Sequence, residues 1–205
     1  MRVIGTEAEL REFVSEPPAA IADKAIDHVD PESARFIATS PFFLLATSAA
    51  DGSCDVSPRG DPPGSVVLLD EHTLVFGDRK GNHRVDSMRN ILTNPQVGML
   101  FLIPGVGEVI RVNGRARIVT GADWMPRLTV QGATPSLAVE VTVDELFLHC
   151  SKALVRSEMW DTATWPARTD VPSAGKIVRS QRPSVTVPAQ VIDDALAADA
   201  KLNRY

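Results

Sequence analysis

Polar residues interrupt an apolar, strand-like pattern at residues 55–61, which read DVSPRGD. Pro58 has no backbone N–H to donate to a neighbouring strand, so a sheet edge there must be free or irregular. Gly60 has no Cβ and lets a flat ligand approach the main chain, while Ser57 supplies a hydroxyl and Arg59 a fixed positive charge. Two interpretations are open: a solvated strand end followed by a loop, or a place where the backbone meets a ligand.

A second polar stretch, residues 77–87 with the sequence GDRKGNHRVDS, joins an expected strand to an expected helix that begins near Asn82. The free N–H groups and the dipole at a helix N-terminus favour a bound anion, and nearby cations suit a dianionic phosphate monoester. The candidate phosphate ligands are Arg79, Lys80, Arg84, Asn82 and Ser87. The alternative is a charged connection in which Asp78 and Asp86 pair with the arginines. A Walker loop is excluded because no G-K-[ST] is present.

A third polar stretch, residues 149–160 with the sequence HCSKALVRSEMW, contains a His-Cys pair and two cations. Adjacent residues on a strand point to opposite faces, so His149 is poorly placed to activate Cys150 as a nucleophile. No other spaced ligands accompany the pair, so a metal site is not expected. Lys152 and Arg156 lie at i, i+4 on one helical face, which is typical of a solvated face or of a second anion-binding set.

Helices and strands must position these residues, and the spacing of apolar residues changes from helix-like to strand-like after residue 40. Alternating or continuous apolar patterns predict strands at 42–49, 53–58, 65–70, 71–77, 96–103, 109–119 and 137–149, with a bulge or bend at Gly114. Helical patterns are found at 6–14, 19–29, 31–40, 82–95, 122–128 (brief), 151–160 and 189–202. In the helix expected at 82–95, Val85, Met88 and Leu92 share one face, with Ile91 beside it.

These elements predict a mainly β (α+β) fold: a small antiparallel β-barrel of six to seven strands with flanking helices. The chain lacks regular strand–helix alternation and G-x-G-x-x-G, which argues against a parallel nucleotide-binding sheet. We expect an N-terminal helical segment at 1–40, the barrel at 41–165, and a tail at 166–205 whose short helix packs on the barrel or on a partner subunit.

Composition limits the classes of protein and of partner. A chain of 205 residues, 44% hydrophobic and 23% charged, is typical of one ordinary globular domain with appendages. The net charge of −5 gives no basic field for nucleic acid or anionic lipid. No apolar run reaches membrane-helix length and no signal peptide opens the chain, so we expect a cytoplasmic protein without nucleic-acid or membrane partners. Cys54 and Cys150 make no disulfide framework and are expected to be small buried hydrophobes.

Five motifs then occur in a characteristic order. They are S-P-R-G-D at 57–61, D-R-x-G-N-x-R-x-D-S at 78–87, N-P-x-V-G-x-L-F-x-I-P-G at 94–105, R-V-N-G at 111–114 and H-C-x-K-A-x-x-R-S-x-x-W at 149–160. Together they cover roughly residues 40–165 and resemble the bacterial branch of the pyridoxamine 5′-phosphate oxidase-like family of FMN-binding split β-barrels. Each motif is weak alone, whereas five in order are specific.

The resemblance implies a homodimer with FMN at the subunit interface. Residues 55–60 would run beside the isoalloxazine edge, residues 76–87 would hold the phosphate and ribityl chain, and residues 152–160 could come from the other subunit. The cofactor-binding residues implied in this way are Ser57, Pro58, Arg59, Gly60, Phe76, Asp78, Arg79, Lys80, Gly81, Asn82, Arg84, Ser87, Lys152, Arg156 and Trp160. Backbone donors near 58–60 would reach N5 or the pyrimidine edge, and Arg59 near N1 and O2 would stabilise the reduced flavin.

The chain also departs from the true pyridoxamine phosphate oxidases. It lacks their basic strand motif of consecutive Arg, Val, Leu, Leu and Lys, and their C-terminal Trp followed by an Arg-Leu-His-Asp/Glu-Arg segment. These departures argue against pyridoxine chemistry. The function expected is that of an FMN-dependent oxidoreductase that moves a hydride or electrons between a nicotinamide or small organic substrate and FMN, without a catalytic side chain or a metal. The alternatives are a flavin-binding module without turnover, such as a stress sensor, and a reductase that uses the deazaflavin F420.

Overall fold

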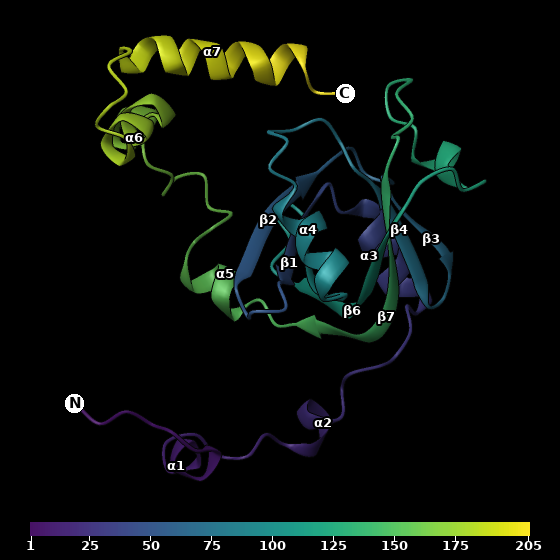
Figure 1. Ribbon diagram of the computed structural model, residues 1–205. Coiled ribbons are helices and arrows are strands. Elements are labelled where there is room, and N and C mark those ends of the chain that lie inside the picture. Colours follow the sequence, from purple (N-terminus) through teal and green to yellow (C-terminus); the bar gives the residue numbers. More distant parts are fainter.

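A single antiparallel sheet of seven strands forms the body of the protein in a computed structural model that describes residues 1–205 (Figure 1). The strands are β1 (Phe42–Ser48), β2 (Cys54–Gly60), β3 (Val66–Asp70), β4 (Thr73–Gly77), β5 (Gln96–Leu102), β6 (Val109–Val119) and β7 (Ala138–His149). Their order in the sheet is β2-β1-β5-β6-β7-β4-β3. The sheet curls into a split β-barrel in which β2 and β3 are the edge strands, so the fold predicted from the sequence is confirmed.

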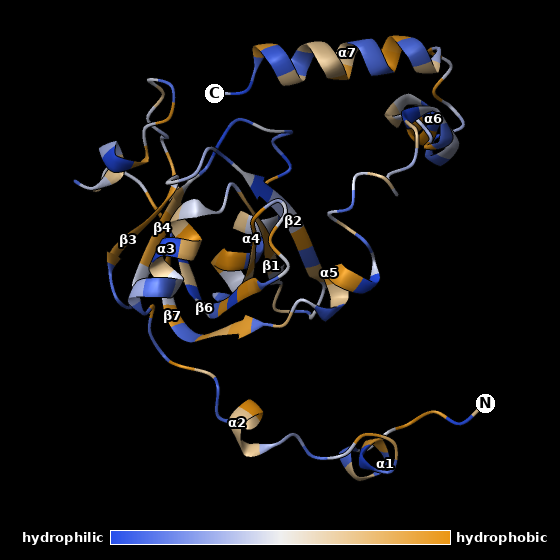
Figure 2. Ribbon diagram, turned by 180° about the vertical axis from the view of Figure 1, so that it is seen from behind, coloured by the Kyte–Doolittle hydropathy of each residue, from blue (hydrophilic) through white to orange (hydrophobic).

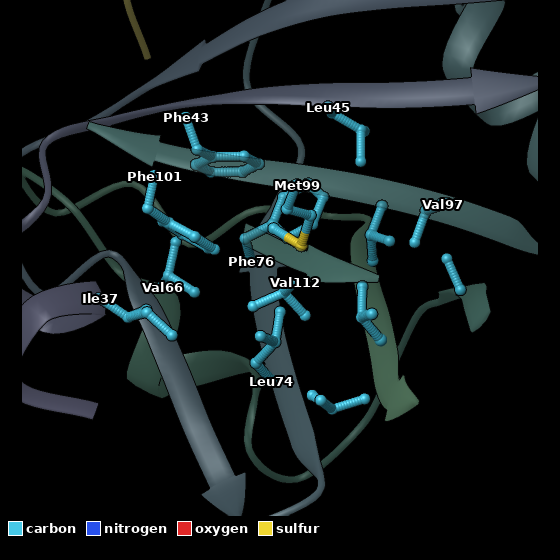
Figure 3. Close-up of a cluster of buried hydrophobic side chains, with 14 of the residues drawn as sticks. Ile37, Phe43, Leu45, Val66, Leu74, Phe76, Val97, Met99, Phe101 and Val112 are labelled. Carbon is cyan, nitrogen blue, oxygen red and sulfur yellow. The ribbon is translucent and has the colours of Figure 1, made fainter. Parts of the chain in front are cut away.

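The inner face of the curled sheet holds the hydrophobic core (Figure 3). Along β1 and β5 every second side chain is buried, as in Phe43 and Leu45 of β1 and Met99 and Phe101 of β5. This alternation is the period-2 pattern that predicted the strands. Phe43 packs against Phe101 with ring centroids 5.1 Å apart.

The longest strand pair, β6 with β7, contains the predicted irregularity at Gly114. The register shifts between Asn113 and Gly114. A Cβ on Gly114 would lie 2.1 Å from the carbonyl oxygen of Thr142, so the two backbones approach more closely there than any other residue type allows.

Two helices complete the core. In α3 (Pro31–Thr39), Asp30 caps the N-terminus by accepting from the N–H groups of Glu32 and Ser33, and Ile37 is fully buried. The second helix, α4 (Asp86–Thr93), lies against β1, where Asn90 Nδ2 donates to Thr47 Oγ1 at 3.0 Å.

Helix α4 corrects two expectations. It begins at Asp86, four residues after the predicted start at Asn82. Its buried face carries Met88 and Ile91, whereas Val85 is 50% exposed and Leu92 75% exposed. The predicted face of Val85, Met88 and Leu92, with Ile91 beside it, is therefore right for Met88 and Ile91 and wrong for Val85 and Leu92. Val85 precedes the helix, and the side that packs on the sheet is centred on Met88 and Ile91, which leaves Leu92 outside it.

The remaining helices lie at the two ends of the chain and around the barrel. They are α1 (Glu7–Arg11), α2 (Ala19–Ala22), α5 (Lys152–Arg156) and the longer α6 (Ala174–Gln181) and α7 (Ala189–Leu202), with two short 3-10 helices, η1 (Met125–Leu128) and η2 (Arg168–Asp170). The helices expected at 19–29 and 151–160 are thus much shorter, and α6 was not predicted. Residue Ile26, expected to be helical, forms an isolated bridge with Leu146 instead.

The first and last helices extend away from the barrel (Figure 1). No residue of α1, α2 or α7 is buried, and α7 carries hydrophobic and hydrophilic residues along its whole length (Figure 2). Helices α6 and α7 pack on each other, with Gly175 directly against the backbone of Ala189. Both cysteines are exposed, so the expectation that Cys54 and Cys150 are buried was wrong. None of the helices combines the length and apolar character that crossing a bilayer would require.

Candidate functional site

A cavity of about 790 Å³ opens beside the edge strand β2. Its wall is built from four segments: residues 55–59 of β2, residues 78–88 between β4 and α4, residues 133–136 of the loop before β7, and Tyr205. The volume lies within the range of small-molecule and cofactor sites, roughly 300–1,000 Å³. Two of the three polar stretches singled out in the sequence therefore meet at one cavity.

One face of β2 supplies alternate side chains to this wall. Asp55, Ser57 and Arg59 pair in register with the inward-facing residues of β1, so all three point to the same side of the strand. Ser57 meets α4, where its hydroxyl lies 2.9 Å from that of Ser87. Because alternate residues of a strand share one face, these three polar side chains form a polar surface along the cavity wall.

Ser87 joins this surface into a continuous hydrogen-bonded chain. Its hydroxyl donates to Asp55 Oδ2 at 2.7 Å, and only 2% of the residue is exposed. Arg59 Nε donates to Ser57 Oγ at 3.2 Å and Arg59 Nη1 to Asp78 Oδ1 at 3.2 Å. The chain runs from Asp55 through Ser87, Ser57 and Arg59 to Asp78 and fixes the side chains that border the cavity.

The loop from 78 to 85 forms the opposite wall in a strained conformation. His83 and Val85 have φ values of 58° and 52°, which residues other than glycine rarely adopt. Asn82 does not cap a helix; its Oδ1 accepts from the backbone N–H of Arg84 at 3.0 Å. The residue that precedes α4 is Val85, which has no capping side chain, so the N–H groups of the first turn of α4 receive no side-chain acceptor from it.

Most cations around the cavity already have anionic partners. Arg84 Nε donates to Asp86 Oδ2 at 2.7 Å, and this pairing raises the pKa of the Arg84 guanidinium. Arg59 pairs with Asp78, as described above. Arg84 is 70% exposed, whereas Arg59 is 23% exposed, so Arg84 stands at the rim and Arg59 in the wall. The pairing of arginines with Asp78 and Asp86, left open in the sequence, is present.

Arg79 is held at the far end of β2 by two hydrogen bonds. Its Nε donates to Asp61 Oδ2 at 2.6 Å, and its Nη2 donates to the carbonyl oxygen of Leu128 at 2.8 Å. Only 15% of the Arg79 side chain and 12% of that of Asp61 are exposed. Arg79 therefore ties three segments together at this end of the cavity. Lys80, next to it, is exposed and makes no side-chain hydrogen bond or ion pair.

The structure brings most of the predicted site residues to the cavity. Those that line it are Ser57, Pro58, Arg59, Asp78, Arg79, Lys80, Gly81, Asn82, Arg84 and Ser87. Phe76 does not; it is 3% exposed and packs on Phe43 in the core, with ring centroids 5.0 Å apart. Gly60 ends β2 opposite Phe42, outside the lining.

The three residues expected from the third stretch lie elsewhere in the chain. Lys152 and Arg156 are exposed at the two ends of α5, and neither lines the cavity. Trp160 Nε1 donates to the carbonyl oxygen of Val106 at 2.8 Å. Within one chain these residues are separate from the cavity.

Sequence reasoning missed several residues of the cavity. Met88 could have been found, because it follows Ser87 on a predicted element, whereas Asp55 was expected only as part of the strand 55–60 beside the ring system. The loop at 133–136 and Tyr205 are far away in sequence and carried no local signal. Gly77 explains how the loop fits, since a Cβ there would lie 2.8 Å from Pro135 Cγ.

The His-Cys pair lies at the end of β7, outside the cavity lining. His149 is partly buried and Cys150 is exposed at the end of β7. Burial first, and then the positive charges of Arg111 and Lys24, lower the pKa of the His149 imidazole. No group of three or more His, Cys, Asp or Glu side chains is arranged to hold a metal ion.

Comparison with known proteins gives one family match. The sequence profile of the family described as "Pyridoxamine 5'-phosphate oxidase" matches residues 29–150, which is more than half of the 205 residues. No curated protein matches the chain. The matched range contains β1 to β7 and most of the cavity wall.

Solved structures share the fold at low sequence identity. HupZ of Group A Streptococcus is 19% identical with a TM-score of 0.50 over 60% of this chain and 95% of that one. An FMN-binding protein from Syntrophomonas wolfei is 11% identical with a TM-score of 0.46 over 57% and 84% of the two chains. A protein related to general stress protein 26 from Clostridium acetobutylicum is 12% identical with a TM-score of 0.43 over 58% and 86%. At these identities the likeness to HupZ shows the fold alone.

Proposed function

The chain belongs to the pyridoxamine 5′-phosphate oxidase family, and from this premise we propose that the cavity beside β2 binds FMN. The observation that carries the proposal is the meeting of two family-like motifs. Residues 57–61 and 78–87 are separated by two strands in the sequence, yet residues of both line one cavity of about 790 Å³. A polar wall with cations at its rim suits a phosphorylated ligand.

The side chains differ in the part of the cofactor that each would hold. We assign the phosphate to Lys80, which has no partner, and to Arg84, which stands at the exposed rim and would share its charge between Asp86 and the phosphate. Ser57 and Ser87 offer hydroxyls along the wall to the ribityl chain. Arg59 lies at the strand edge where the ring system would run, and Asp78 offsets part of its charge there. FMN itself supplies the hydride and electron chemistry when it is bound.

The activity proposed is that of an oxidoreductase acting between a nicotinamide or small organic substrate and FMN. Hydride transfer to a flavin needs neither a side-chain nucleophile nor a side-chain base. The chain's part is to bind, orient and shield the cofactor. A flavin-binding module without turnover uses the same cavity, and the two differ only in whether a reductant is consumed.

We also propose that the protein is a homodimer. The outer face of β1, β2 and β5 exposes an apolar surface, which we call the outer apolar face: Phe42, Leu44, Ala46, Val56, Pro58, Leu100 and Leu102. Val56 is 60% exposed and Phe42 36%. An exposed apolar surface next to the cavity suits a two-fold interface, in which the same surface of each chain would cover the other. Across such an interface Lys152, Arg156 and Trp160 of each chain would face the cavity of its partner.

The test is the identity of the molecule that accompanies the protein. Protein purified without added cofactor is expected to absorb near ~450 nm, as an oxidised flavin does, and to release a compound with the mass of FMN on denaturation. An absorption band near ~420 nm, together with a released compound of the mass of F420, would show that the cofactor is the deazaflavin and not FMN. Failure to bind added FMN in a fluorescence titration would contradict the proposal. Steady-state oxidation of NADH and NADPH by the holoprotein then separates the oxidoreductase from the module without turnover.

A further inference from the structure

The cavity is poor in the aromatic surface that a flat tricyclic ring system prefers. Most of its lining is polar or charged, and its aliphatic residues are small or few: Val56, Val85, Met88 and Ala133. Among the lining residues Tyr205 is the only Phe, Tyr or Trp. Apart from the imidazole of His83, an aromatic contact with a ligand in this cavity must therefore come from Tyr205 or from outside the chain.

The position of Tyr205 is unusual for its segment. Residues 194–204, which include the second half of α7, are all exposed. Tyr205 alone is partly buried, at the end of the chain marked C, which lies above the barrel beside the loops near β2 (Figure 1). The tail thus returns to the barrel at a single residue, and that residue lines the cavity.

A largely buried ion pair, Arg79 with Asp61, lies beside the tyrosine ring. The Arg79 guanidinium lies 5.8 Å from the centroid of the Tyr205 ring, within the range of a cation–π contact. Arg79 is itself fixed by Asp61 and by the carbonyl oxygen of Leu128. Burial, followed by the adjacent Asp61 carboxylate, raises the pKa of the Tyr205 hydroxyl, in keeping with a ring that is seated on this pair.

Resting on the proposed function, we propose that Tyr205 is a ligand-contacting residue whose ring forms the aromatic wall of the cavity, against which the ring system of bound flavin lies. The tail from 166 to 205 then contributes to binding, because helix α7 carries the tyrosine back to the cavity. This contact lies outside residues 29–150, so it is a property of this chain's tail and not of the segment that matches the family.

Three variants of the full chain test the inference by binding alone. Tyr205→Ala removes the ring, Tyr205→Phe keeps the ring and removes the hydroxyl, and Leu202→Ala changes an exposed residue of the same tail. Fluorescence titration with FMN measures affinity, and stopped-flow mixing with excess apoprotein measures dissociation. We expect Tyr205→Ala to raise the Kd about 2- to 12-fold, the effect of one aromatic pair, mainly through faster dissociation. Tyr205→Phe and Leu202→Ala should stay within about 2-fold of the unchanged chain.

The outcomes separate this inference from the function on which it rests. If the unchanged chain binds FMN and Tyr205→Ala binds it equally well, the inference is overturned and the proposed function stands. Tighter binding by Tyr205→Ala would likewise overturn it, because the tyrosine would then be obstructing the cavity. If the unchanged chain binds no FMN, both fall together. An equal loss in Tyr205→Phe would assign the contact to the hydroxyl and overturn the aromatic wall.

Discussion

At the scale of the residue, Ser87 decides how the cavity wall is organised. A hydroxyl has one proton and two lone pairs, so a single serine can donate to a carboxylate while it contacts a second hydroxyl. Ser87 donates to Asp55 and contacts Ser57, which in turn accepts from Arg59. Because Ser87 is almost fully buried, these bonds are made in a low-dielectric setting, and the polar chain is stiff before any ligand arrives.

Arg84→Ala tests the phosphate end of the cavity. We expect it to weaken FMN binding by at least ~1.5 kcal/mol, the scale of a charged hydrogen bond. Arg35→Ala is the matched control, because Arg35 is 78% exposed and paired with Glu32, as Arg84 is 70% exposed and paired with Asp86, yet only Arg84 lines the cavity. Fluorescence titration of the two folded variants gives the comparison. Equal affinities would argue against Arg84 as a phosphate ligand.

His149 gives the stability a pH dependence whose sign follows from its surroundings. Burial and the charges of Arg111 and Lys24 lower the pKa of His149 in the folded chain, so folding favours the neutral ring. Above about pH 6.5, the ordinary pKa of a histidine, the ring is neutral in both the folded and the unfolded chain, and His149 costs no stability. As the pH falls from there through the lower pKa of the folded chain, the unfolded chain takes up the proton first and the free energy of unfolding falls. His149→Gln should therefore lose less stability than the unchanged chain between about pH 7.5 and pH 5.5 in urea denaturation.

His28 is expected to change the stability with pH in the opposite direction. The Asp27 carboxylate raises the pKa of His28, so its contribution is present at low pH and is lost as the pH rises through the folded pKa. His28→Gln should consequently lose more stability than the unchanged chain over the same acid range, by a smaller amount because the pair is exposed. Parallel pH profiles for both variants would show that neither ring titrates as its surroundings imply.

At the scale of the element, local signals predicted the strands better than the helices. Alternating or continuous apolar patterns identified all seven strands to within a few residues, because every strand except β2 buries side chains in the core. The start of α4 was wrong because Asn82 is a good capping residue, yet its side chain caps a turn at Arg84 and not a helix. The left-handed conformations of His83 and Val85, which delay the helix, have no signature in residue type.

Gly114 allows β6 and β7 to approach closely, and a single added Cβ atom tests how much the fold depends on this approach. Gly114→Ala would place a Cβ 2.1 Å from the carbonyl oxygen of Thr142 and should destabilise the fold by about 1–3 kcal/mol or more, since the β6–β7 pair must separate. Gly98→Ala is the matched control in the adjacent strand β5, where a Cβ would lie 3.4 Å from Asn113 Oδ1, an ordinary contact. It should change the unfolding free energy by no more than about 0.5 kcal/mol in chemical denaturation. Equal effects at both glycines would rule out the close approach as the cause.

The candidate site was predictable where it is local and not where it is assembled by folding. Ser57, Arg59 and Ser87 lie in short motifs with unusual composition, and the cavity gathers them. Asp61 was part of a recognised motif, but its pairing with Arg79 joins the end of β2 to the loop after β4 and depends on the register of the whole sheet. Tyr205 was invisible, because nothing in the composition of the tail indicates where its end returns.

At the scale of the whole molecule, the barrel leaves much apolar surface without a cover. The outer apolar face lies next to the cavity. The two terminal segments expose Leu10 and Phe13 in and after α1, and Val191 and Leu202 in α7, away from the barrel. Such surface is costly in water and is a common mark of an interface. A second copy with two-fold symmetry would cover the outer apolar face of both chains at once.

Leu44→Glu tests that assembly. Leu44 lies in a cross-strand row with Pro58 and Leu100, at the middle of the outer apolar face, and burying an unpaired carboxylate there on both sides of a two-fold axis would oppose association. Sedimentation is expected to change from the mass of two 22.1 kDa chains to the mass of one, with the far-ultraviolet circular dichroism unchanged. Val171→Glu, at a residue that is 44% exposed in the tail, controls for the added charge and should stay dimeric. If the partner completes the cavity, the loss of the dimer in Leu44→Glu should also lower the affinity for FMN. A Leu44→Glu variant that still sediments as a dimer would exclude this face as the interface.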